Sequence, residues 1–227
     1  MVSKTLFDYS ISYSPIHGET VSGDACLVRC NRGFGLIAVI DALGHGIEAA
    51  SVAKQAIDAL KKGPMLPFDQ HLVNAHAALR QTRGAVMNVA LLDGKADHMT
   101  WSGVGDVEGV LIRAKNSDEK DRAEDGTVHK NEHIPVRPGI VGLTLPKMFA
   151  SGVDLEVGDV LIMTTDGIKN DYVRDVDVFD DLSHIAERIM SDHSKGHDDS
   201  LVLVLRWKGI SDREGKGSMV ERSRRDL

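Results

Sequence analysis

The amino-acid sequence predicts an α+β protein in which two β-sheets pack together and helices cover their outer faces. Three early strands are followed by two helices, then by a longer series of strands, and finally by one helix and one strand. The 227 residues are enough for one large domain with a substantial core. We therefore expect a single domain over residues 1–208, followed by a polar and disordered tail at 209–227.

The first third of the chain indicates three strands and two helices. Residues 6–12 and 25–29 are short runs of mixed polarity, whereas 35–40 reads GLIAVI and predicts a strand buried on both faces. In residues 47–60 small apolar side chains recur at helical spacing, so this helix can lie directly against the strands. A second helix is expected at 68–80, after a break that contains prolines.

The remainder of the chain is mostly β-rich and predicts antiparallel hairpins. A polar stretch at 115–130 interrupts it and predicts a solvated excursion, while 179–190 has the apolar spacing of a third helix. Residues 201–207 read LVLVLRW and predict a last buried strand. The other expected strands are residues 85–92, 98–104, 107–113, 147–153 and 159–165.

Composition and charge exclude several classes of function. The formal net charge of −7 opposes non-specific binding to nucleic acid. No run of about 18 apolar residues could span a bilayer, and the start of the chain lacks the pattern of a signal peptide. We expect a cytoplasmic protein without a membrane partner. Cys26 and Cys30 lie too far apart along a predicted strand for a disulfide and are interpreted as packing residues.

An aspartate stands at one end of each of four predicted strands: Asp24, Asp41, Asp166 and Asp198. Any one of them alone fits an ordinary turn or cap residue. Ionised carboxylates at the ends of buried strands are costly unless positive charge compensates them, and no matching lysines or arginines stand at these positions. Hard divalent cations such as Mg²⁺ and Mn²⁺ prefer oxygen ligands, so the pattern favours a metal site.

Six motifs add a family resemblance that spans about residues 23–205. In order they are SGDACLV, AVIDALGHGIEAA, RGAVMNVALL, WSGVGDVEGVLI, VLIMTTDGI and HDDSLVLVL. Together they resemble the metal-dependent PPM or PP2C-type phosphatases of the SpoIIE-like branch. Within that branch the chain is most similar to the stressosome phosphatases of the RsbX type, because it reads as a bare catalytic domain. The resemblance implies an αββα sandwich of two antiparallel sheets, with metals in a cleft at one edge.

The same resemblance implies a role for each aspartate. Asp41 would bridge two divalent ions, Mn²⁺ or Mg²⁺, and Asp24 would complete one site together with the backbone carbonyl of Ala42. Asp166 and Asp198 would hold the other ion. Two ions with a shared carboxylate can activate a water near neutral pH, which would attack phosphorus without a phosphoenzyme. The implied activity is that of a protein serine/threonine phosphatase.

Two departures from the family pattern, and four nearby residues, bear on this prediction. Ala42 stands where most relatives have glycine, which matters only if that position needs an unusual φ. The histidine and the N-terminal arginine of the larger eukaryotic enzymes match no position here.

His45 could contact the phosphate or simply form the turn before the helix. Asp199 could orient its neighbour or cap a turn, Thr165 is interpreted as core or as a support for the site, and Asp106 as a hairpin residue.

The resemblance also implies a partner, and other functions stay open. The substrate would be a phosphorylated STAS-domain or stressosome scaffold protein, and the enzyme a monomer. One alternative is a non-catalytic interaction module of the same fold, which the retention of all the candidate ligands opposes. A small-phosphoester hydrolase is another. A kinase-like or nucleotide-binding domain would use the glycine-rich turns, but the chain contains no GxxxxGK[ST] motif.

Overall fold

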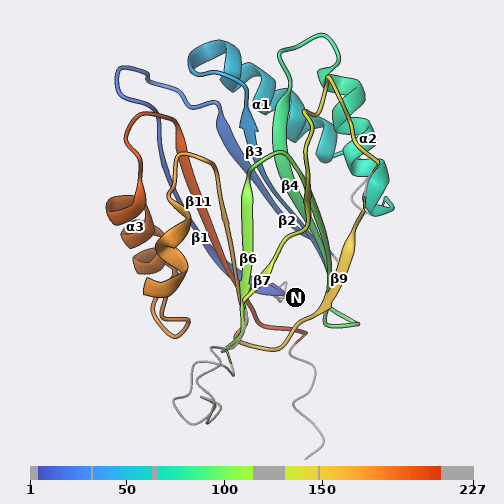
Figure 1. The fold of residues 1–227 in the computed structure, drawn as a ribbon. Helices are drawn as coiled ribbons and strands as arrows, with labels where there is room; N and C mark the ends of the chain where they lie inside the picture. Colours follow the sequence, from blue (N-terminus) through green and yellow to red (C-terminus); the bar gives the residue numbers. More distant parts are fainter. Residues whose placement is uncertain (1–4, 32, 63–65, 115–130, 148, 211–227) are drawn as a thin grey trace, which may run out of the picture.

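Two β-sheets pack face to face, and helices lie on the outer face of each (Figure 1). The computed structural model describes residues 5–31, 33–62, 66–114, 131–147 and 149–210. The predicted solvated excursion at 115–130 and the tail from residue 211 lie outside the described residues. The predicted sandwich with outer helices is confirmed.

The first sheet is five-stranded and antiparallel, in the order β1-β11-β10-β6-β7. β10 is buried along its whole length and β11 at every residue except Arg206, because a helix covers one face of the sheet and the second sheet covers the other. The strands are β1 (Phe7–Ser14), β6 (Glu108–Ile112), β7 (Glu132–His133), β10 (Val160–Thr164) and β11 (Ser200–Trp207).

The second sheet is six-stranded, in the order β2-β3-β4-β5-β8, with β9 paired to β5. Only β5 and β8 run parallel among its described pairs. The apolar run that predicted a doubly buried strand is β3, and six consecutive residues of it are buried. The strands are β2 (Asp24–Asn31), β3 (Phe34–Ala42), β4 (Ala85–Asp93), β5 (His98–Val104), β8 (Val136–Arg137) and β9 (Ser151–Asp154).

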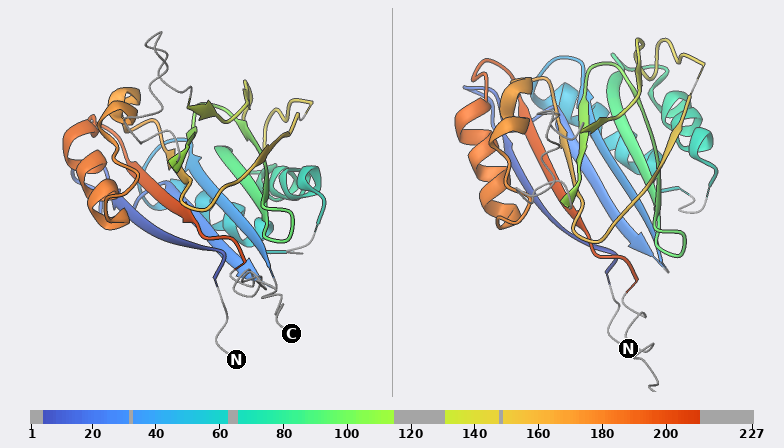
Figure 2. Two further views of the ribbon diagram at one scale, coloured as in Figure 1. Left: turned by 90° about the horizontal axis from the view of Figure 1, so that it is seen from below. Right: turned by 60° about the horizontal axis from the view of Figure 1, so that its bottom comes forward.

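Helices α1 (Gly46–Leu60) and α2 (Phe68–Leu79) cover the second sheet, whereas the 3₁₀ helix η3 (Asn170–Asp175) and α3 (Leu182–His193) cover the first (Figures 1 and 2). Ala49, Ala53 and Ala56 of α1 are buried, and the helix packs against β2 and β3, as the spacing of its small residues predicted. Of the helices in the described part of the chain, none is long and apolar enough to cross a bilayer.

The hydrophobic core forms three layers. The middle layer lies between the sheets and includes the fully buried Trp101 and Trp207. A second layer joins α1 and α2 to the six-stranded sheet, and a third joins α3 and η3 to the five-stranded sheet. Ile210 packs against the middle layer, so the ordered structure continues two residues beyond Lys208.

Some element boundaries differ from the sequence predictions. The strand expected at 147–153 is confined to Ser151–Asp154, and η3 was not predicted. The third helix begins three residues later than expected, because the Asp181 carboxylate accepts a hydrogen bond from the Ser183 N–H at 2.9 Å and caps the helix there. These differences do not alter which strands carry the candidate site.

Candidate active site

Asp24 and Asp41 lie side by side because β2 and β3 are antiparallel. They are direct partners in the register of these strands, at the edge where β2 begins and β3 ends. Along the strands they share a face with Cys26 and Val39, which pack in the middle layer of the core. Both carboxylates therefore face the space between the two sheets.

Thr165 connects this pair to the other sheet. Its hydroxyl group donates a hydrogen bond to Asp24 Oδ2 at 2.6 Å and accepts one from the Leu201 N–H at 2.9 Å. Thr165 directly follows β10, so the bond joins the end of one sheet to the start of a strand in the other. The interpretation of Thr165 as a support for the site agrees with this arrangement.

Asp166 and Asp198 come from the two neighbouring strands β10 and β11. Asp166 follows β10, and Asp198 precedes β11. The loops that carry them approach so closely that a Cβ atom on Gly167 would lie 2.0 Å from the carbonyl oxygen of Asp199. Position 167 therefore requires glycine, which gives the TDG motif a physical reason.

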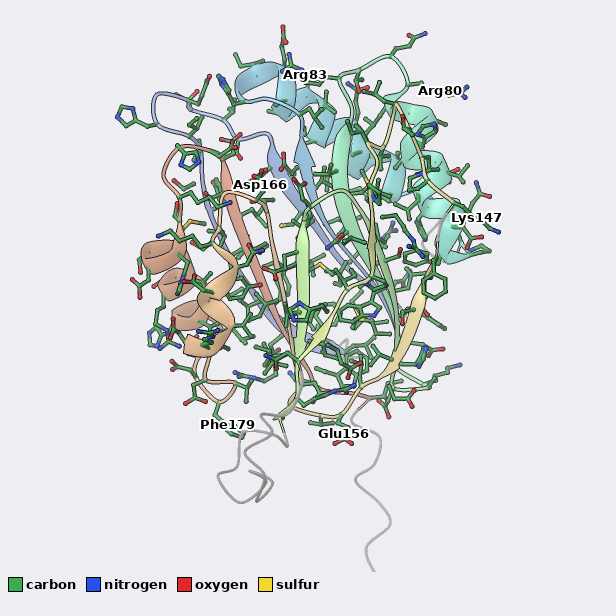
Figure 3. All side chains as sticks on the ribbon, in the orientation of Figure 1. Arg80, Arg83, Lys147, Glu156, Asp166 and Phe179 are labelled. Carbon is green, nitrogen blue, oxygen red and sulfur yellow. The ribbon has the colours of Figure 1, made fainter. Side chains whose placement is uncertain are left out.

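One cleft of about 690 Å³ collects most of these residues. Four carboxylates line it, those of Asp41, Asp106, Asp166 and Asp198, together with the imidazoles of His45 and His197. Asp24 is only 8% exposed and lies behind Asp41 at the same edge. Figure 3 shows Asp166 between the two sheets at one end of the sandwich, with Glu156 at the opposite end.

The carboxylates raise one another's pKa. Burial, chiefly, and the neighbouring Asp24, Asp166 and Asp106 raise the pKa of Asp41 to about 8. Burial and nearby carboxylates raise the pKa of Asp24 to about 7, although the hydrogen bond from Thr165 acts in the opposite direction. Burial and Asp198 also raise the pKa of Asp166, and Lys195 and His197 partly offset this increase. The cluster carries an excess of negative charge that its own side chains do not neutralise.

This donor set fits hard divalent cations, although the carboxylates are not drawn together into a closed cage. Among the described residues, no group of three or more His, Cys, Asp or Glu side chains forms a ready-made metal site. Divalent cations bound among these carboxylates would compensate their negative charge. The observation that supports the fit is the set of raised pKa values on oxygen-only ligands around one cleft.

The backbone at Ala42 does not need the glycine that most relatives have at this position. Among the described non-glycine residues only Asp97 has a positive φ, so Ala42 adopts an ordinary extended conformation. Its N–H donates to the Gly23 carbonyl at 3.2 Å, and its side chain packs in the layer beneath α1. Alanine is therefore compatible with a ligating carbonyl at this position.

His45 lies at the rim of the cleft, immediately before α1. Its Nδ1 is 2.9 Å from Glu19 Oε1, and its side chain is 58% exposed. The flanking Gly44 and Gly46 have φ values of +87° and +73°, which explains the glycines of the GHG motif. Arg83 donates to the Leu43 carbonyl at 3.1 Å and holds the same turn. Both interpretations of His45, turn residue and phosphate contact, are compatible with this position.

Asp199 fastens the loop that leads to Asp24. Its side chain is buried and accepts hydrogen bonds from the Ile16 N–H at 2.8 Å and the Gly23 N–H at 2.7 Å. Its own N–H donates to Asp198 Oδ1 at 2.8 Å. Asp199 is therefore hydrogen-bonded both to the backbone next to Asp24 and to the carboxylate of Asp198.

Sequence reasoning missed several residues of the cleft. The prediction that Asp106 is a hairpin residue is wrong: β5 and β6 belong to different sheets, so its turn crosses from one sheet to the other and forms part of the cleft wall. Lys195 donates to the backbone carbonyl of Asp166, and His197 lines the cleft beside it. The only sequence signal for these two was their position just before the Asp198–Asp199 pair. Glu19 had no signal, because its place depends on how the loop before β2 folds back.

The sequence matches the family model for stage II sporulation protein E (SpoIIE) over residues 33–208. The chain belongs to the SpoIIE family. The predicted resemblance is thereby confirmed for most of the chain, and with it the class of enzyme, a PP2C-type protein serine/threonine phosphatase that depends on divalent metal. No curated protein is similar enough in sequence to count as a match.

Solved structures of SpoIIE-family and other PP2C-type domains share this fold. A chain of the bacterial stressosome, described as a modular system adapted to control secondary messenger signalling, is 25% identical with a TM-score of 0.76, and the match covers 88% of this chain and 99% of that one. RsbX in complex with magnesium is 16% identical with a TM-score of 0.76, covering 89% and 96%. The PP2C domain of SpoIIE from Bacillus subtilis is 18% identical with a TM-score of 0.71, covering 91% and 65%.

Proposed function

We propose that this SpoIIE-family chain removes phosphate from serine or threonine of a regulatory partner protein in the cytoplasm. The partner would be a STAS-domain or stressosome scaffold protein, and the enzyme would act as a monomer built from one domain over residues 1–208. The similarity to a chain of the bacterial stressosome and to RsbX supports this choice of partner.

The observation that carries the proposal is the meeting of four aspartates from both sheets at one edge. We propose Asp24, Asp41, Asp166 and Asp198, with the Ala42 carbonyl, as the ligands of two divalent cations, Mn²⁺ or Mg²⁺. Bound cations would neutralise the carboxylates and supply a water of lowered pKa for attack on phosphorus. The relative with magnesium bound is RsbX.

The chain's own residues then have distinct tasks. Thr165 holds Asp24 in position through its 2.6 Å hydrogen bond. Asp199 fixes the backbone before Asp24 and the carboxylate of Asp198. Lys195 places a positive charge beside Asp166 by donating to its backbone carbonyl, and His197 lines the cleft, where a substrate phosphate would enter. No side chain is assigned the role of a covalent nucleophile.

The decisive experiment measures hydrolysis of a phosphoserine protein and of an aryl phosphate with Mn²⁺, with Mg²⁺ and with EDTA. We expect metal-dependent activity that falls by about a hundredfold or more in the Asp41→Asn variant, because the bridging carboxylate is lost. Calorimetric titration of each metal into both proteins reports binding separately. Metal binding without hydrolysis of either substrate would favour the interaction module, and hydrolysis of the aryl phosphate alone would favour a small-phosphoester hydrolase.

A further inference from the structure

A second groove adjoins the catalytic cleft. It has a volume of about 560 Å³ and is lined by Arg137, Pro138, Pro146, Lys147 and Phe149. Pro138 also lines the catalytic cleft, so the two hollows share a wall. A polypeptide whose phosphorylated residue sits in the cleft can therefore continue into this groove.

The backbone on both sides of the groove is fixed to the six-stranded sheet. Arg137 belongs to β8, and its carbonyl accepts a hydrogen bond from the Gly105 N–H at 2.9 Å. The carbonyl of Phe149 accepts one from the Ser102 hydroxyl at 2.8 Å. The Arg137 guanidinium lies 5.7 Å from the centre of the Phe149 ring, which restrains both side chains. A groove that is ordered in advance loses little conformational entropy on binding.

The charge of the groove is opposite to that of its surroundings. Arg137 and Lys147 are exposed, and within the described residues neither takes part in an ion pair. Among the described residues no carboxylate lines the groove, whereas the whole chain has a net charge of −7 and the neighbouring cleft is rich in aspartate. Figure 3 shows Lys147 at the surface, on the flank of the molecule that carries α2.

We infer that this groove, the Arg137–Phe149 groove, binds acidic residues that flank the phosphorylated residue of the substrate protein. The positively charged side chains of Arg137 and Lys147 would attract carboxylates of the substrate. Phe149 and the prolines would pack against aliphatic parts of the same segment. The inference rests on the proposed phosphatase function and narrows its substrate class to phosphoproteins with an acidic segment beside the phosphate. The net negative charge of the enzyme opposes nucleic acid as the occupant.

The test compares two phosphoserine peptides that differ only in their flanks, one with glutamates on both sides of the phosphoserine and one with glutamines. The readout is the ratio of their kcat/KM values. We expect the wild-type enzyme to favour the acidic peptide by about 5- to 10-fold at low salt, and the preference to shrink as salt screens the charges. In the Arg137→Ala/Lys147→Ala double variant the ratio should fall to about one.

Two further variants make the test specific. In Lys61→Ala/Lys62→Ala the same amount of positive charge is removed from the far end of α1, about 20 Å of helix away from the cleft, and the ratio should stay at the wild-type value. In Arg137→Glu/Lys147→Glu the preference should reverse in favour of a lysine-flanked peptide. Because each readout is a ratio, a partial loss of folded enzyme does not change it.

The outcomes separate this inference from the proposed function. If the wild-type enzyme hydrolyses both peptides with equal kcat/KM, the groove inference is wrong and the phosphatase function stands. An acidic preference that survives unchanged in both groove variants would also overturn the inference. If no phosphopeptide or phosphoprotein is hydrolysed with either metal, the proposed function fails first.

Discussion

The hydroxyl group of Thr165 directly links the two sheets at the catalytic edge. It donates to the buried Asp24 carboxylate and accepts from the Leu201 N–H, so both of its hydrogen-bonding capacities are used. A hydrogen bond to a buried carboxylate is stronger than an ordinary one, and its loss leaves an uncompensated charge. Thr165 therefore contributes both to stability and to the position of a candidate ligand.

Replacing Thr165 with valine removes the hydroxyl group but keeps the shape of the side chain, so it separates the effect of the hydrogen bonds from that of packing. We expect Thr165→Val to lose about 1–2 kcal/mol of unfolding free energy and to lower kcat/KM by about 10- to 100-fold. Thr165→Ser keeps the hydroxyl group and should retain most of the activity. Urea denaturation and steady-state kinetics measure the two effects. Activity retained in Thr165→Val but lost in Thr165→Ser would show that the methyl group, not the hydrogen bond, is what matters.

The carboxylates of the proposed metal site are costly to ionise in this fold. Burial and mutual repulsion raise the pKa of Asp24 and Asp41 to about 7 and about 8. A fold selected for stability alone would place neutral side chains there. Bound divalent cations would compensate the free-energy cost of ionising these carboxylates. This compensation is the physical basis of the proposed site.

At the scale of elements, the loop between β1 and β2 is held to the cleft by Asp199. Asp199→Asn leaves only one carbonyl oxygen to accept hydrogen bonds from Ile16 and Gly23. We expect a loss of about 1–3 kcal/mol of stability and a roughly tenfold weaker affinity for Mn²⁺ in calorimetric titration, because the backbone before Asp24 is freed.

A matched control for Asp199 exists at the opposite end of the sandwich. Asp159 is also buried and accepts backbone hydrogen bonds, from Ala114 at 3.1 Å and from Glu156 at 3.0 Å. Asp159 also forms an ion pair with Arg113 at 2.7 Å, so Asp159→Asn should destabilise the fold by at least as much as Asp199→Asn and leave the affinity for Mn²⁺ unchanged. If both variants weaken metal binding equally, the effect of Asp199 is global and not local.

The packing of α2 against α1 predicts a pH dependence of stability. His71 is fully buried in α2, and neither ring nitrogen makes a well-formed hydrogen bond within the described residues. Burial lowers its pKa below the ordinary 6.5, and the Leu60 carbonyl offsets only part of the effect. The unfolded chain therefore binds a proton at this site at a higher pH than the folded chain does.

The sign follows from this difference in proton binding. The His71 contribution to stability is fully present above about pH 7 and is lost as the pH falls from 6.5 through the lower pKa of the folded state. His71→Leu should lose less stability than the wild type between about pH 7.5 and about pH 5 in urea denaturation. His184→Leu, an exposed replacement in α3, should follow the wild type. Parallel pH profiles for wild type and His71→Leu would contradict the prediction.

At the scale of the whole molecule, the described fold includes Ile210, two residues beyond the predicted domain end at 208. This side chain packs against the core between the sheets, next to the turns that contain Gly33 and Gly94. A chain ended after Ile210 should keep the full rate of aryl phosphate hydrolysis, whereas one ended after Lys208 should lose about 1–2 kcal/mol of stability from the exposed apolar surface. Thermal denaturation of both would show whether the boundary lies at residue 208 or 210.

The sequence alone determined the class of fold and the strand ends that carry the site. Apolar runs such as residues 35–40 predict buried strands because burial on both faces leaves no polar positions, and the aspartates at the strand ends are visible in the same pattern. The ordered motifs identified the SpoIIE branch, which the family match confirmed. Local periodicity and composition carry this information without any knowledge of long-range contacts.

Only the tertiary structure decided which residues meet. Thr165 and Asp24 are 141 positions apart and share one hydrogen bond, and Asp199 reaches back 183 positions to Ile16. Arg137 and Phe149 are brought together because β8 pairs with β5 and the Phe149 carbonyl accepts a hydrogen bond from Ser102 of the same strand. These contacts depend on the order of strands in two sheets and on their packing, and a pattern of neighbouring residues does not encode either one.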